Sequence, residues 1–440
     1  MRAGNLSQRG GKMIVSHVFS GNSLLFTLSS EPEDKSHYPG FGGSRRFKYR
    51  YSDDSPFPHV HPDRLALVAL MNSIPFVGTR LQIDWPVSER FLTASNELIS
   101  RIKITSVAAN QPHIERPISG RFALSFSGGA DSVAALAVMP HSTEPVFMLR
   151  EKKQWHRSLY DSEAAEESCR MLRKLGFKVH IIESDFEYLR DPVGFPTDLA
   201  VATSAILIAE SRNFESIAFG TILESAFGTS GESYREYNQS SHFRLWSPLF
   251  DAVGLGYSLP VAGVSEVGTA IICNTNPLGE THQSCIRGKW EAPCNRCWKC
   301  FRKNTLMAAL EGRELPENSE IMIDKSKEVR KKLLEDKPIR HEGVLTYALQ
   351  RSFGGGPVID SLRNLVRAGN LRTDWMNHWY PGSSDLIDPS YREFTIEKLL
   401  NSLGEMSAEQ INDLQNWENS HDNFREERLS TLEGLLNVPK

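Results

Sequence analysis

The chain has 440 residues, of which 50 are Lys or Arg and 54 are Asp or Glu, so its net charge is −4. This balance excludes a strongly basic coat for nucleic acids and a long acidic disordered tail. At roughly 150 residues per domain, the length suggests about three domains. The apolar runs are shorter than the roughly 20 residues of a membrane helix, and no signal-like stretch stands near the start. We therefore expect a cytoplasmic protein that has no membrane partner.

The first quarter of the chain differs in pattern from the rest. Residues 1–12 are basic and rich in glycine, and we expect them to be a flexible leader. Residues 13–115 combine β-like runs with a proline-capped apolar helix, which predicts an N-terminal accessory α+β domain. The stretch 106–120 is polar, contains two prolines and shows no periodicity, so we expect a linker there.

Short apolar strands alternate with helices over residues 116–311. This alternation predicts an α/β fold, with a parallel sheet and helices on both of its faces. Ligands of such sheets bind at the carboxyl ends of the strands. Charged helical segments follow, so that residues 312–440 are expected to form a helical accessory region. The expected strands cover 121–126, 145–149, 178–184 and 216–221, and the expected helices cover 132–139, 162–176 and 198–212.

The sharpest motif, SGGADS, lies between the first of these strands and the first helix. Two adjacent glycines let backbone N–H groups turn inward, and the following helix adds the positive end of its dipole. Serine hydroxyls can donate to a phosphate, and an aspartate can hold Mg²⁺. The Walker and Rossmann patterns are absent, while a Gly-Gly pair alone is more often a simple tight turn. We expect Ser127, Gly128, Gly129, Asp131 and Ser132 to bind phosphate, with Asp131 holding the magnesium ion.

Four of the six cysteines fall within 16 residues. Four thiolates are the number that a closed tetrahedral Zn²⁺ site takes, and such a site is structural because it keeps no open position. A redox pair and four unligated thiols are the alternatives. The remaining cysteines, Cys169 and Cys273, are expected to be ordinary buried residues. The predicted zinc ligands are Cys285, Cys294, Cys297 and Cys300.

The segment SFSGGADS resembles the S-G-G-x-D-S signature of the PP-loop ATP pyrophosphatases, which have the adenine nucleotide alpha-hydrolase-like fold. The resemblance implies that ATP is cleaved between its α and β phosphates, giving pyrophosphate and an adenylated substrate. It also implies a catalytic role for Asp131. The phosphate motif together with C-x8-C-x2-C-x2-C is similar to the 7-cyano-7-deazaguanine synthase-like proteins of the queuosine pathway, over about residues 120–310. In that family a carboxylate is adenylated, and ammonia then displaces AMP.

The chain departs from the synthase pattern where the family binds its substrate. TILESAFGTSGESYREYN replaces the acidic, Tyr-containing loop, and GFPTD replaces Pro-Gly-Arg-Asn. The sequence therefore leaves two acceptors as alternatives. One is a modified base, and the other is a partner protein encoded in the same operon, which is the acceptor of synthase-like proteins of phage defence. A related type is an ATP-dependent epimerase that acts on the terminal glutamate of a muramoyl dipeptide. Outside the enzymes, the alternative is a non-catalytic ATP-binding sensor or scaffold.

Three residues at strand ends complete the predicted site. Lys152 follows the strand 145–149, and we expect it to act in catalysis by neutralising a phosphate or a substrate carboxylate, with a solvated charge run as the alternative. Gly220 ends the strand 216–221 and is expected to contact the nucleotide. Glu224 follows in the same crevice, as a base, a ligand of an amine or an exposed acid.

The partners expected from these patterns are a carboxylate substrate, either a small molecule or a protein, together with ATP, Mg²⁺ and Zn²⁺. An RNA partner is disfavoured by the net charge of −4. The Arg and Lys residues around the cysteines nevertheless leave an RNA partner as an alternative.

Overall fold

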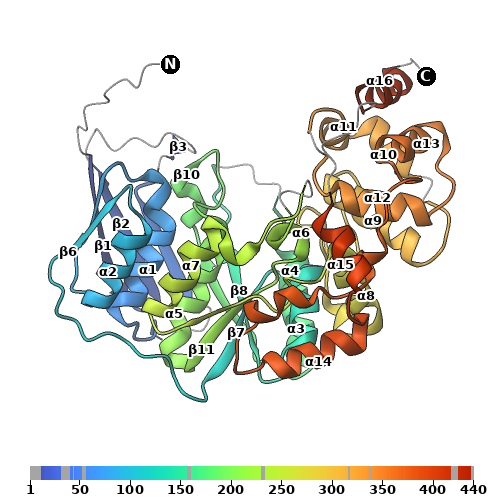
Figure 1. Cartoon of the computed structure of the whole chain (residues 1–440). Helices are drawn as coiled ribbons and strands as arrows, with labels where there is room; N and C mark the ends of the chain where they lie inside the picture. The colour runs from blue at the N-terminus through green and yellow to red at the C-terminus, as the bar shows by residue number, and fades with distance from the viewer. Residues whose placement is uncertain are drawn as a thin grey trace, which may run out of the picture.

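A computed structural model describes residues 11–30, 40–42, 44–51, 56–155, 160–228, 233–315, 318–336, 339–417 and 425–437. In this part of the chain, ten strands form one mixed sheet in the order β12-β11-β7-β8-β9-β4-β2-β1-β5-β6 (Figure 1). The predicted α/β class is confirmed at this level. The strands are β1 Lys12–Ser20, β2 Ser23–Ser30, β4 Arg46–Tyr51, β5 Arg80–Ile83, β6 Lys103–Ser106, β7 Arg121–Phe126, β8 Glu144–Arg150, β9 His180–Ser184, β11 Phe214–Phe219 and β12 Gly256–Ser258.

Five neighbouring strands, β9, β8, β7, β11 and β12, are parallel. β7 is the central one, because it pairs with β8 on one side and with β11 on the other. The chain leaves β7 toward β8 and β9, and later crosses to β11 and β12 on the opposite side. The carboxyl end of β7 is therefore the topological switch point, where open α/β sheets bind their ligands.

The N-terminal strands extend the same sheet. β4 pairs antiparallel with β9, with Tyr49 opposite Ser184, and Ser184 Oγ donates to the Lys48 carbonyl at 2.8 Å. The sheet is thus continuous across residue 115, although the domain boundaries at residues 12, 115 and 311 stay predictions. Residues 1–10 of the predicted leader lie outside the described residues, and Lys12 already belongs to β1. A second sheet of two short strands pairs β3 (Gly40–Phe41) with β10 (Arg190–Asp191).

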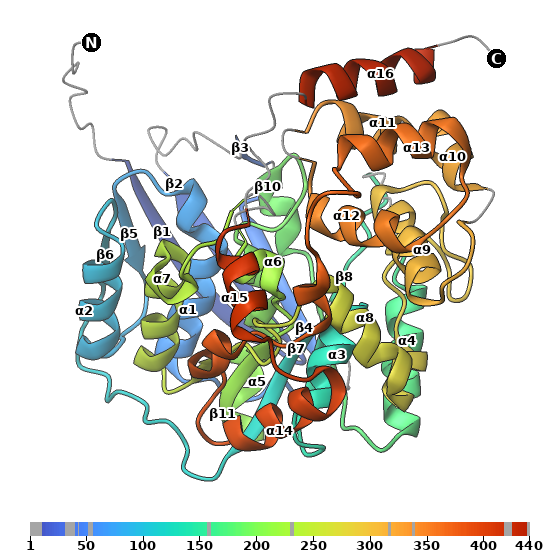
Figure 2. The same ribbon diagram turned by 45° about the vertical axis from the view of Figure 1, so that its right-hand side comes forward.

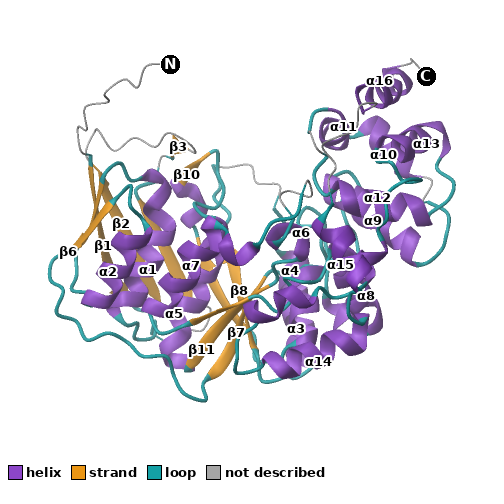
Figure 3. Ribbon diagram, viewed as in Figure 1, coloured by secondary structure: helices purple, strands orange, loops and turns teal. Residues whose placement is uncertain are grey.

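Helices cover both faces of the parallel strands, because alternate strand residues point to opposite sides. Ala123 of β7 belongs to a core that includes α1, α5 and α7, while its neighbour Leu124 belongs to a core with α3, α4, α8 and α14. Figure 3 shows α1, α5 and α7 in front of the strands. The bounds are α1 Pro62–Ser73, α2 Glu89–Leu98, α3 Ala130–Val138, α4 Glu163–Lys174, α5 Thr203–Arg212, α6 Leu223–Ala226, α7 Ser241–Ala252 and α8 Glu266–Thr275.

Among the C-terminal helices, α15 contributes Leu414 to the core that includes α1, α5 and α7, and the others pack in two further places. α10 to α13 and α16 form a third core together with the cysteine segment and α9, whereas α14 returns to α3 and α8. Figure 2 shows the two packing places apart from each other: α14 lies beside α3, and α16 lies at the opposite end of the molecule. None of the described helices combines the length and apolar character needed to cross a membrane. The bounds are α9 Trp298–Leu310, α10 Asn318–Lys325, α11 Lys327–Leu334, α12 Glu342–Arg351, α13 Gly356–Leu365, α14 Arg392–Leu403, α15 Ala408–Gln415 and α16 Arg425–Asn437.

One buried hydroxyl joins the N-terminal elements to the central ones and can be tested. The Tyr49 hydroxyl donates to Thr203 Oγ1 of α5 and accepts from Asn72 Nδ2 of α1, both at 2.8 Å. In Tyr49→Phe, both partners stay buried without this oxygen, so we expect the free energy of unfolding to fall by about 1–3 kcal/mol. Urea denaturation followed by circular dichroism measures the change. A loss below about 0.5 kcal/mol would contradict this role of the hydroxyl.

Candidate functional site

The predicted phosphate loop lies at the switch point, between the end of β7 and the start of α3. Gly128 has a φ of +76°, and a Cβ there would lie 3.2 Å from the Ala165 backbone, so the turn needs glycine. Gly129 is the N-cap residue of α3. The hydroxyl oxygens of Ser127 and Ser132 lie 3.1 Å apart across the turn. The loop therefore has backbone and hydroxyl groups gathered at the positive end of a helix dipole.

Gly220, just after β11, packs directly against this loop. A Cβ on Gly220 would lie 2.9 Å from the backbone nitrogen of Ser132 and 3.0 Å from the carbonyl oxygen of Asp131. The end of β11 can approach the loop only because position 220 has no side chain. The structure thus brings together all six residues predicted to bind the nucleotide.

Two cavities meet at Asp131 and Gly220, which line both. The first, of about 430 Å³, we call the aromatic cavity after Phe219, Tyr237 and His242 in its wall. The second, of about 420 Å³, we call the basic cavity. Its wall holds Arg287, Lys299, Arg302, Lys332, Arg340 and His341.

A chain of hydrogen bonds crosses the aromatic cavity. Tyr237 Oη lies 2.8 Å from His242 Nδ1, and His242 Nε2 lies 2.7 Å from Asp198 Oδ2. A carboxylate only accepts, so Nε2 carries the ring proton toward Asp198. Burial alone would raise the pKa of Asp198, but the hydrogen bond from His242 outweighs it and lowers that pKa. The wall thus offers a fixed carboxylate and a phenol to a ring or sugar in the cavity.

A buried carboxylate organises the base of the basic cavity. Glu266 is 1% exposed, and its oxygens lie 2.9 Å from Arg302 Nε and 3.0 Å from Lys303 Nζ. Burial opposes ionisation, but the surrounding cations outweigh it and lower the pKa of Glu266. His341 Nδ1 lies 3.6 Å from the same carboxylate. Since burial, reinforced by Arg302, lowers the pKa of His341 to about 4, this histidine is neutral at pH 7.

Asp131 connects the phosphate loop to this network. The Thr269 hydroxyl donates to Asp131 Oδ1 at 3.0 Å, and Lys303 Nζ lies 4.0 Å from the same oxygen. Both cavities therefore share one carboxylate that still has free lone pairs, because one hydrogen bond uses only part of its acceptor capacity.

Glu224 is a buried carboxyl group that binds the start of α8. Both of its carboxylate oxygens accept from the backbone nitrogen of Glu266, at 2.9 and 3.0 Å, at the start of α8. Burial, reinforced by the charge of Glu266, raises the pKa of Glu224 to about 8. Glu224 is 7% exposed, so the expectation of an exposed acid is wrong.

The four clustered cysteines come together in space. Their sulfur atoms all lie within 4.8 Å of one another, with 3.5 Å between Cys297 and Cys300 and 3.8 Å between Cys294 and Cys300. Four thiolates around Zn²⁺ at about 2.3 Å would have their sulfurs about 3.8 Å apart. The backbone nitrogen of Cys294 donates to Cys285 Sγ, and that of Cys300 to Cys297 Sγ. The cluster therefore has the size of a metal site, and Cys169 and Cys273 are buried elsewhere, as predicted.

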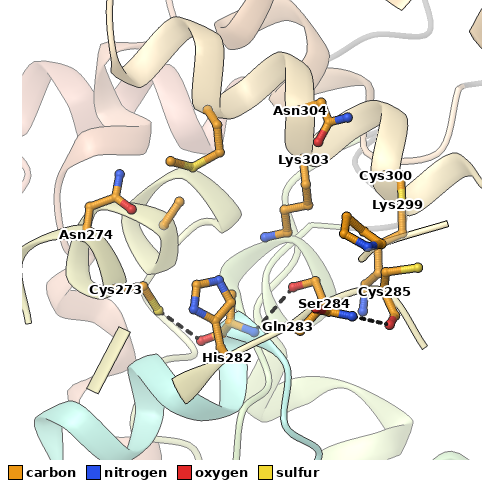
Figure 4. Close-up of a pocket in the computed structure, with 14 residues that line it drawn as sticks. Cys273, Asn274, His282, Gln283, Ser284, Cys285, Lys299, Cys300, Lys303 and Asn304 are labelled. Atoms are coloured by element: carbon orange, nitrogen blue, oxygen red, sulfur yellow. Dashed lines mark hydrogen bonds between the residues drawn. The ribbon is translucent and has the colours of Figure 1, made fainter. Parts of the chain in front are cut away.

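The cysteine segment rests on the phosphate loop. The backbone nitrogen of Gln283 donates to the Gly128 carbonyl at 3.0 Å, and that of Ala130 donates to Ser284 Oγ at 3.4 Å. Residues of this segment line a small cavity of about 190 Å³ together with Lys299 and Lys303 of α9, and Figure 4 shows these side chains around it. Cys285 directly follows Ser284, so a shift of the cysteine cluster would move the residues that contact the phosphate loop.

Lys152 is the predicted site residue that lies apart from the others. Its ammonium lies 3.9 Å from Asp161, its side chain is 54% exposed, and neither of the two cavities is lined by it. Its catalytic role stays a prediction.

The sequence did not predict that the cations lining the basic cavity belong to the site. Lys299 was visible in the sequence only as a charge near the cysteines, while Arg340 and His341 belong to a helical region without any motif. No periodicity or spacing could have linked Thr269 or Glu266 to Asp131.

Comparisons with known proteins found a match to part of the chain. The sequence pattern of a family of unknown function (DUF6395) matches residues 245–418. This range begins in α7, contains all four clustered cysteines and ends beyond α15, while the phosphate loop lies outside it. No curated protein and no solved structure is significantly similar to the chain.

The buried Glu224 predicts a specific pH dependence of stability. Its pKa is about 8 in the folded protein against an ordinary value of 4.5. The folded state thus keeps a proton that the unfolded state releases, and the free energy of unfolding falls as the pH rises between these two values. Glu224→Gln stays neutral and still offers one oxygen to Glu266. We expect its stability relative to the unchanged protein to rise by about 1 kcal/mol or more from pH 5 to pH 8.

Urea unfolding of both proteins at the two pH values measures this difference. A difference that stays constant between pH 5 and pH 8 would mean that Glu224 is ionised in the folded protein throughout.

Proposed function

We propose that this protein is an ATP-dependent adenylating enzyme of the PP-loop type, which converts ATP to AMP and pyrophosphate. It would activate a carboxylate for attack by a nitrogen nucleophile. The observation that carries the proposal is the position of Asp131: it follows the glycine turn at the start of α3 and lines both cavities. A phosphate chain on the loop would therefore have room for adenosine on one side and for an acceptor on the other.

The phosphate loop suits a triphosphate. The turn Gly128-Gly129 and the start of α3 supply N–H donors and a helix dipole, and Ser127 and Ser132 supply hydroxyls. Asp131 fits a magnesium ion, because among the described residues its carboxylate accepts only from Thr269 and lies 4.0 Å from the nearest cation. Magnesium held there would neutralise charge on the phosphate oxygens.

The proposed reaction has two steps. A carboxylate oxygen of the acceptor attacks the α-phosphorus, the bond to the bridging oxygen breaks, and pyrophosphate leaves with the electron pair. A nitrogen nucleophile then attacks the acyl carbon, AMP leaves, and the nitrogen loses a proton. The protein positions the reactants and neutralises charge, and no covalent protein nucleophile is needed. The acceptor would be a modified base or a partner protein, as in phage-defence systems.

A structural zinc ion is part of the proposal. Four sulfur atoms at these separations fit a closed tetrahedral site, which leaves no position for a substrate. Zinc would stabilise the segment that contacts the loop through Gln283 and Ser284.

Replacing Asp131 by Asn tests the adenylation. With Mg²⁺-ATP and a panel of carboxylates (a carboxydeazaguanine, muramoyl dipeptides and neighbouring encoded proteins), we expect AMP and pyrophosphate with one panel member. Asp131→Asn should lower this rate about a hundredfold or more and still bind nucleotide. Asp385→Asn, which changes an exposed aspartate outside both cavities, is the matched control. Nucleotide binding without turnover would instead favour the sensor, and formation of ADP would contradict cleavage between the α and β phosphates.

Metal analysis tests the zinc site and its coupling to the loop. We expect about one zinc ion per chain, and less in Cys294→Ser. Removing zinc with a chelator should lower the melting temperature and weaken binding of α,β-methylene-ATP, because the cysteine segment contacts Gly128 and Ala130. Unchanged nucleotide affinity in zinc-free, folded protein would contradict the coupling.

A further inference from the structure

The basic cavity carries more positive charge than its own carboxylates neutralise. Its wall holds five Lys or Arg side chains and three carboxylates, an excess of two positive charges. His341 adds no charge at pH 7, because burial lowers its pKa to about 4. The five cations are Arg287, Lys299, Arg302, Lys332 and Arg340.

Three of these cations are already paired. Arg302 lies 2.9 Å from Glu266, and Arg287 forms an ion pair with Glu328. Lys332 lies 2.7 Å from the aspartate four residues further along the chain. These ion pairs neutralise three of the five cations.

Lys299 and Arg340 are the remaining two. Neither side chain forms an ion pair or a hydrogen bond with any described residue, although both line the cavity. They come from distant parts of the chain, the first turn of α9 and the residues just before α12. The indole N–H of Trp298, which is 5% exposed and lines the same cavity, also lacks an acceptor among the described residues. Unpaired cations beside a buried donor without an acceptor are the complement of an anion.

We propose that the basic cavity binds a second anionic group of the acceptor, a phosphate or a carboxylate other than the one that is adenylated. Lys299 and Arg340 hold this group, and a guanidinium can do so with two parallel hydrogen bonds. The inference rests on the proposed adenylation and adds the class of acceptor, a molecule with two anionic groups. It also assigns a task to the C-terminal region, which supplies Arg340.

Isothermal titration calorimetry on the full-length, zinc-containing protein tests this site. The protein is first saturated with Mg²⁺ and α,β-methylene-ATP, so that the phosphate loop is occupied, and is then titrated with inorganic phosphate and, separately, with succinate. We expect one of the two anions to bind, phosphate if the group is a phosphate and succinate if it is a carboxylate. Arg340→Gln and Lys299→Gln should each weaken this binding about tenfold or more.

Two controls support the comparison. Lys327→Gln removes an exposed positive charge of α11 outside the cavity and should bind the anion like the unchanged protein. Lys299 lies between two cysteines of the cluster, so zinc content is measured in each variant; Arg340 is exposed and distant from the cluster in sequence.

Three results would overturn the proposal: no binding of either anion, equal binding by the variants, or loss of anion binding whenever the nucleotide is present. The last result would mean that the cavity holds the phosphates of ATP itself. If the protein bound no nucleotide but kept phosphate binding that depends on Arg340, the adenylation proposal would fail and the anion site would stand.

Discussion

The buried carboxylate of Glu266 joins the parts of the structure on which the site depends. It stands at the start of α8 and pairs with Arg302 and Lys303 of α9, while its backbone nitrogen donates to Glu224. A carboxylate this deeply buried stays ionised only because cations surround it. Ion pairs therefore hold α8 and α9 together at the base of the basic cavity, and the hydrogen bond from the backbone of Glu266 to Glu224 links α6 to them.

The phosphate loop receives support from three directions. Gly220 packs against it from β11, Gln283 binds its Gly128 carbonyl, and Thr269 holds Asp131 from α8. Each contact comes from a different element, so the loop is positioned before any ligand arrives. The proposed reaction would need a loop that is positioned in this way, because electrostatic stabilisation depends on preorganised groups.

The sequence predicted the elements that local pattern controls. The strand 121–126, the following glycine turn and the helices of the parallel unit depend on periodicity and on short motifs, and the structure has them at nearly the predicted positions. The four cysteines were predicted to gather because their spacing is short, and they do.

Features that depend on distant pairing could not be predicted from the sequence. The continuation of the sheet from β9 to β4 joins residues more than 130 positions apart, and it depends on contacts such as Ser184 with Lys48. In the same way, Arg340 reaches the basic cavity only because α12 packs beside α9. The Arg and Lys residues near the cysteines left an RNA partner open in the sequence, whereas in the structure Arg302, one of these residues, pairs with the buried Glu266.

A crystal structure of the protein with Mg²⁺ and α,β-methylene-ATP tests directly whether the loop of residues 127–132 binds the phosphates of ATP. We expect the β and γ phosphates to lie on residues 127–132, with the metal ion on Asp131 and the nucleotide in the crevice between the ends of β7 and β11. A nucleotide bound elsewhere, or bound with its phosphates directed away from the loop, would contradict this expectation.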